Sequence, residues 1–71
     1  MLELKKKDHP IFNEFYEGVA VSGFKVECIL DDHCVRYMTF NRGGNPISRH
    51  EYKNSNKDLC YRRATEALNR L

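Results

Sequence analysis

The side chains that are candidates for binding a metal or acting as nucleophiles lie between residues 28 and 60. They are three cysteines, two histidines and two adjacent aspartates: Cys28, Asp31, Asp32, His33, Cys34, His50 and Cys60. Zinc sites usually pair cysteines about two to four residues apart, whereas five residues separate Cys28 from Cys34 and no second pair follows. Cys28 and Cys60 also fall on apolar faces, where a free cysteine packs as a small hydrophobe. We therefore expect no metal and no cofactor.

Catalysis by a cysteine nucleophile or a phosphate loop is also not indicated. His33 and Cys34 are adjacent, so on a strand their side chains point to opposite faces. The glycines of Arg42-Gly43-Gly44 lack the G-x-x-x-x-G-K-[ST] pattern of a P-loop. A chain of 71 residues also leaves little room for a deep cleft. We expect no catalytic residue and a protein that is not an enzyme.

Positive charge is concentrated in the second half of the chain. Met1 to Val35 carries four lysines against seven acidic residues, whereas Arg36 to Leu71 carries eight lysines and arginines against three acidic residues. Contacts to phosphates need such cations, and the N-terminus of a helix adds backbone donors. The expected binding residues for nucleic acid or another anionic partner are Arg42, Arg49, Lys53, Lys57, Arg62, Arg63 and Arg70.

The bulk composition indicates one small globular domain spanning residues 1–71. Hydrophobic residues make up 41% and charged residues 31% of the chain, which is ordinary for a folded domain. No apolar run approaches the ~18 residues of a membrane span, and no apolar stretch follows the N-terminal lysines. The odd number of cysteines favours reduced thiols. We therefore expect a cytoplasmic protein.

A helix from Asn56 to Leu71 is the clearest element expected. Ser55 and Asp58 have the spacing of a capping box. The expected apolar stripe is Cys60, Ala64, Ala67, Leu68 and Leu71. Arg62, Glu66 and Arg70 follow one another at intervals of four on the polar face, which favours ion pairs.

Two strands precede this helix. Phe24 to Leu30 alternates, with Phe24, Val26, Cys28 and Leu30 on one face, and Cys34 to Phe40 is rich in strand-forming residues, with both faces partly covered. Ile47 to Tyr52 would add an edge strand after a glycine-rich loop.

The N-terminal third is expected to begin with a short helix. Asp8 would cap it, and the apolar stripe Ile11, Phe12, Phe15 and Tyr16 would end at Gly18. A strand running into Val19-Ala20-Val21 is the alternative. The expected fold is thus α+β: an N-terminal helix, a three-stranded antiparallel sheet with a fourth strand as an alternative, and a C-terminal amphipathic helix packed on one face.

The closing segment resembles the last helix of double-stranded-RNA-binding domains. The resemblance is carried by Ser55-Asn56-Lys57-Asp58-Leu59-Cys60, Ala64, Ala67-Leu68 and Leu71. The resemblance implies the element order helix, three strands, helix. It also implies that Lys57 and Lys53 contact phosphates. Asn56 replaces the family's first lysine, and the Gly-Pro-x-His loop is missing.

Two kinds of binding function follow. The small size and the separate acidic and basic regions favour a protein-binding accessory or inhibitor of the phage or mobile-element kind. The alternative is a nucleic-acid-binding module for duplex RNA or DNA that uses the basic half. A homodimer is a further alternative, formed through the aromatic side chains of Phe12, Phe15 and Tyr16.

Overall fold

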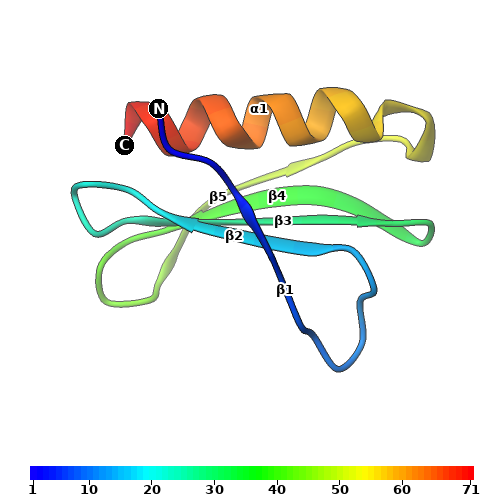
Figure 1. The fold of residues 1–71 in the computed structure, drawn as a ribbon, viewed down its shortest axis with the longest axis horizontal. Coiled ribbons are helices and arrows are strands. Elements are labelled where there is room, and N and C mark those ends of the chain that lie inside the picture. The colour runs from blue at the N-terminus through cyan, green and yellow to red at the C-terminus, as the bar shows by residue number, and fades with distance from the viewer.

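In the computed structural model, which describes residues 1–71, a five-stranded antiparallel sheet supports one C-terminal helix (Figure 1). Each strand pairs with its neighbour in sequence, so the order across the sheet is β1-β2-β3-β4-β5. The strands are β1 (Lys5–Lys7), β2 (Phe15–Val19), β3 (Lys25–Asp31), β4 (Cys34–Phe40) and β5 (Pro46–Glu51). A 3-10 turn (Asn54–Asn56) leads into α1 (Lys57–Arg70).

The core lies between α1 and the middle of the sheet. Side chains alternate between the two faces along β3 and β4, so every second one points toward the helix, as expected. They pack against the buried helix residues Cys60, Ala64 and Leu68. The buried residues of this layer are Leu4, Ala20, Val26, Cys28, Val35, Tyr37, Cys60, Ala64 and Leu68. The expected apolar stripe of the helix is therefore confirmed for Cys60, Ala64 and Leu68, while Leu71 at its end is 36% exposed.

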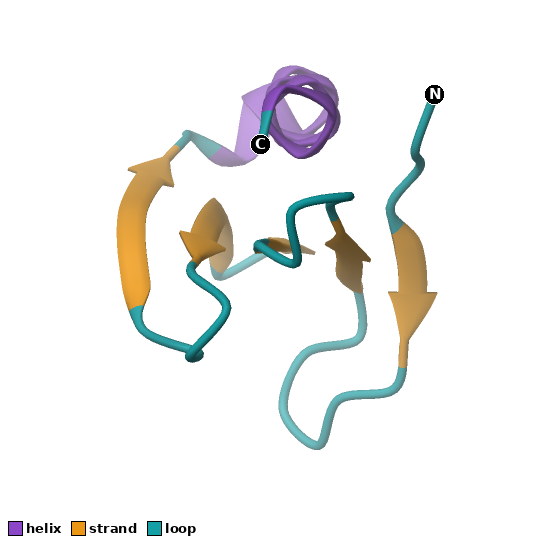
Figure 2. Ribbon diagram, turned by 90° about the vertical axis from the view of Figure 1, so that its left-hand side faces the viewer, coloured by secondary structure: helices purple, strands orange, loops and turns teal.

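The sheet curves around the helix, as Figure 2 shows. The N-terminal segment lies beside α1, where Leu2 and Asn69 exchange two hydrogen bonds of 2.8 and 2.9 Å. The Tyr61 hydroxyl donates to the carbonyl of Leu4 at 3.4 Å. On the opposite side of the sheet β5 is the other edge, and most of its residues are exposed on both faces. The expectation of an edge strand over Ile47 to Tyr52 is confirmed to within one residue at each end.

The predicted N-terminal helix is wrong, and so is the three-stranded sheet. Phe15–Val19 forms β2 between β1 and β3, so the sheet has five strands. Phe15 and Tyr16 fall on opposite faces, because Tyr16 pairs with Cys28 and Phe15 with Ile29. The helix, three strands and helix implied by the resemblance to RNA-binding domains therefore do not occur. That resemblance rests on the closing helix alone.

The segment before β2 folds under the face of the sheet that the helix leaves open (Figure 1). The His9 ring packs against Phe12 at 5.0 Å and against Phe15 at 4.8 Å, measured between ring centroids. Its Nδ1 accepts hydrogen bonds from the backbone N–H groups of Ile11 and Phe12. These contacts bury Phe15, so the aromatic side chains expected to support a homodimer pack within one chain.

The start of the closing helix also differs from expectation. Asn56 precedes the first helical residue, and no side chain caps the helix there, so the Ser55–Asp58 capping box is wrong. Ser55 belongs instead to the 3-10 turn, which satisfies its own backbone groups through an Asn56 N–H bond to the Lys53 carbonyl. None of the helices is long and apolar enough to cross a membrane.

Candidate nucleic-acid interface

A row of three aromatic rings lies on the helix-facing side of β4 and β5. Tyr37 and His50 are direct cross-strand partners, so their side chains share one face. Their ring centroids are 4.7 Å apart with 22° between the planes, and Tyr37 also stacks with Tyr52 at 6.3 Å and 24°. Tyr37 is buried and Tyr52 is half-buried, whereas His50 is exposed. Since Tyr37 covers one ring face of His50 and the residue is nevertheless exposed, we infer that the other face is the one open to a ligand.

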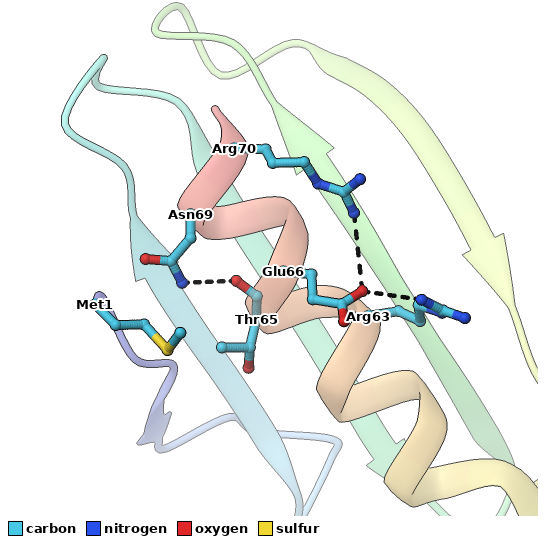
Figure 3. A pocket seen from close by; sticks show the side chains of 6 residues that line it. All are labelled: Met1, Arg63, Thr65, Glu66, Asn69 and Arg70. Carbon is cyan, nitrogen blue, oxygen red and sulfur yellow. Dashed lines mark hydrogen bonds and ion pairs between the residues drawn. The ribbon is translucent and has the colours of Figure 1, made fainter.

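Two arginines of α1 project toward this row. Figure 3 shows Arg63 and Arg70 on the side of the helix where β4 and β5 lie, with Glu66 between them. One oxygen of the Glu66 carboxylate is 3.0 Å from a nitrogen of Arg63 and 3.9 Å from a nitrogen of Arg70. A single carboxylate thus faces two guanidinium groups, whose side chains are 51% and 73% exposed. Their remaining N–H groups are free for another acceptor.

We call these five residues, Tyr37, His50, Tyr52, Arg63 and Arg70, the α1–β5 surface. An open depression of about 450 Å³ adjoins it on the outer side of the helix, lined by Met1, Arg63, Thr65, Glu66, Asn69 and Arg70 (Figure 3). The surface therefore combines flat rings with cations whose charge is only partly neutralised.

Electrostatics connect the rings to the arginines. Burial raises the pKa of Tyr37, and the positive charges of Arg70 and Arg63 act in the opposite direction on the same hydroxyl. Burial likewise raises the pKa of Tyr52, and Arg63 again opposes the shift. Both hydroxyls are therefore neutral donors at physiological pH, and both lie within the field of the helix arginines.

Only part of the expected binding set meets at this surface. Arg62 lies on the same helix as Arg63 and Arg70 and has no acidic partner. Lys53, just after β5, is exposed and also has no ion pair. These residues extend the positive charge along the helix and beyond the end of the strand.

Three other residues of the expected set lie elsewhere. Arg49 is on the open face of the sheet, because it alternates with His50, and it pairs with Glu51 at 3.1 Å. Arg42 lies in the β4–β5 loop against Gly23. Lys57 begins α1 and its ammonium is 2.6 Å from the Asp32 carboxylate. The structure does not bring these three together with the helix arginines.

The start of α1 is surrounded by acidic residues. Glu14, Asp31, Asp32 and Asp58 line the depressions around Lys57. The hydrogen bond from Lys57, together with its charge, lowers the pKa of Asp32, which keeps that carboxylate ionised. Lys57 is thus one cation among four carboxylates, whereas Arg63 and Arg70 share the single carboxylate of Glu66.

Two of the three cysteines are buried together in the core. Cys28 and Cys60 are fully buried, with 3.9 Å between their sulfur atoms. The contact with Cys60 and then burial raise the pKa of Cys28, so its thiol stays protonated. Cys34 lies on β4, apart from this pair. No three of the histidine, cysteine, aspartate and glutamate side chains converge as metal ligands.

The stacking of His50 in the aromatic row is not predicted by the sequence. His50 is absent from the expected binding set, although the arginine next to it in the chain belongs to that set. The useful signal was the alternation of His50 and Tyr52 on one strand next to Tyr37 on another. That signal becomes readable only when the hairpin register is known, and a register shift at Thr39–Phe40 intervenes.

Searches of protein-family models, curated protein sequences and solved structures found no match to this chain.

Proposed function

We propose that this protein binds nucleic acid through the α1–β5 surface. The observation that carries the proposal is the pairing of Arg63 and Arg70 with a single carboxylate, Glu66, on the helix that packs over Tyr37, the ring on which exposed His50 stacks. Arginine side chains supply bidentate donors for phosphate, and flat rings supply a surface for bases. The helix packs on β4, and Tyr37 of β4, on which His50 stacks, lies within the field of both arginines, so one ligand can contact both groups.

The charge around this surface supports an anionic ligand. Lys53, Arg62, Arg63 and Arg70 provide four cations, against the one carboxylate of Glu66. Exposed ion pairs contribute only about 0–1 kcal/mol. A phosphate can therefore take over the free N–H groups of the arginines without a large loss from the existing contacts. The acidic residues around Lys57 lie at the other end of the helix and orient the ligand toward its C-terminal half.

A binding assay with matched charge variants tests this function. Fluorescence anisotropy is measured with labelled single-stranded and duplex RNA and DNA at about 50 and about 200 mM salt. The double variant Arg63→Gln/Arg70→Gln should weaken binding and lower the slope of log K against log salt by about 1.4 for a single strand or about 1.8 for a duplex. The control Lys5→Gln/Lys7→Gln removes the same charge from β1, where neither lysine has an ion pair, and should bind as the wild type does. Absence of binding to every nucleic acid at the lower salt would refute the function.

A protein partner is the second candidate, favoured by the open face of the sheet. Exposed Val19 and half-buried Met38 and Phe40 lie there among ion-paired Lys25 and Glu27. Mixed apolar and charged residues of this kind are common in protein interfaces. The simplest such partner is a second copy of the chain, and light scattering tests it. A mass above that of the monomer, which falls to the monomer mass in Val19→Asp, would support self-association through this face. A monomer at high concentration would exclude a homodimer.

A further inference from the structure

We infer that the ligand of the α1–β5 surface is a single strand, of which one unpaired base stacks on the free ring face of His50. The inference rests on the proposed function and names the class of nucleic acid. The stack of Tyr37 on His50, at 4.7 Å and 22°, ends at an exposed ring. A base added there would continue the stack.

The ring geometry discriminates between a duplex and a single strand. In a duplex each base is already stacked on both faces, and only its edges reach the grooves. An exposed ring face offers nothing to such edges, whereas an unpaired base has a free face of its own. His50 therefore gives the surface a preference for unpaired nucleotides that arginines alone would not provide.

The position of the row favours a flexible ligand as well. His50 lies on the side of β5 that faces α1, where the sheet curves up beside the helix (Figure 2). Arg63 and Arg70 are seven residues apart on α1, which is about 10 Å along the helix axis. The two cations can therefore contact different phosphates of one strand while one of its bases rests on the ring.

Stacking has to be separated from charge in the test. The probes are a labelled single strand of about 12 nucleotides, a duplex of the same sequence, and an abasic strand of equal length that keeps the phosphates. His50→Ala should weaken binding of the base-containing strand by about 5-fold to about 150-fold, the usual range for loss of one stacking ring. His50→Phe, which keeps a flat ring, should restore most of the affinity. The control His33→Ala removes another exposed histidine, in the β3–β4 turn, and should have no effect.

The outcomes separate this inference from the function on which it rests. Weaker binding of His50→Ala to the base-containing strand, with unchanged binding to the abasic strand, supports stacking. If His50→Ala binds as the wild type does, or if the duplex binds more tightly than the single strand, the stacking inference is refuted while the arginine-dependent function stands. If no probe binds even at low salt, both fail.

Discussion

Gly18 of β2 lies against the side chain of Leu68 on α1, and replacing it tests how that layer is packed. A Cβ atom at Gly18 would lie 2.6 Å from Cδ2 of Leu68 and 3.2 Å from Cδ2 of Leu4. Both leucines are buried, at 1% and 5% exposure, and have little room to move. Overpacking of this kind costs about 1–3 kcal/mol, and alanine recovers about 0.5 kcal/mol of backbone entropy. We expect Gly18→Ala to lower the free energy of unfolding by about 1–2 kcal/mol.

The size of this effect can be tested against its cause. Leu68→Ala alone should cost about 2–5 kcal/mol, because it leaves a cavity in the core. In the double variant Gly18→Ala/Leu68→Ala, the methyl group added on β2 occupies part of that cavity, so the two losses should not add. We expect the double variant to be more stable than the sum of the single changes by about 1–2 kcal/mol.

Urea unfolding followed by tyrosine fluorescence and circular dichroism measures these free energies. A domain of this size has a total stability of about 4–10 kcal/mol, so the expected losses are a large fraction of it. Gly43→Ala is the matched control, since the added Cβ would meet nothing closer than 3.4 Å, and it should change stability by less than about 0.5 kcal/mol. Additive losses within about 0.5 kcal/mol, or a neutral Gly18→Ala, would refute the packing of α1 against β2.

Three further predictions concern titration and thiol reactivity. The hydrogen bond from Lys57 lowers the pKa of Asp32, so this ion pair stabilises the folded protein at pH values above the ordinary carboxyl pKa of about 4, and the stabilisation is lost as pH falls below it. In Lys57→Met the pKa of Asp32, followed by NMR, should return to its usual range. The hydrogen bond to Glu14 and then burial raise the pKa of Tyr16 to about 12. The hydrogen bond therefore stabilises the folded protein below about pH 10, and this stabilisation is lost as pH rises toward 12. In Glu14→Gln the absorbance of ionised Tyr16 should develop at lower pH. Cys34 should react first with a thiol reagent, and equal reactivity of the two buried cysteines would contradict the core described here.

The sequence predicted the elements that have strong periodicity and missed those that depend on partners. Strand β4 matches its expected bounds, because its strand-forming residues and the flanking turns agree. The interval of Phe12, Phe15 and Tyr16 fits a helix equally well. The segment forms a strand because side chains on both of its faces are packed: Tyr16 contacts Tyr61 of α1, and Phe15 contacts His9 on the opposite face. Neither contact is visible in local sequence.

Strand β1 had no signal at all. Three consecutive lysines have no apolar alternation, and all three are exposed. They form a strand because the backbone of β2 offers its edge and because Leu4 inserts under the helix. Charged residues on a short edge strand also discourage pairing with other chains, so tertiary contacts rather than propensity determine this element.

The structure brings together only part of the expected binding set. Glu66 pairs with Arg70, as their spacing of four predicts, but its other partner is Arg63 and the expected pair with Arg62 is wrong. Arg49 and His50 separate to opposite faces because they are neighbours on a strand. The register of the five strands determines which residues lie on the sheet face that packs against the helix. No local sequence pattern specifies that register.

Whether the α1–β5 surface binds unpaired bases is tested most directly by one comparison: the affinity of wild type and His50→Ala for a base-containing single strand and for its abasic counterpart. We expect His50→Ala to lose about 5-fold to about 150-fold for the strand with bases and nothing for the abasic strand. Equal affinity of the two proteins for the base-containing strand would contradict the assignment of His50 as the stacking residue.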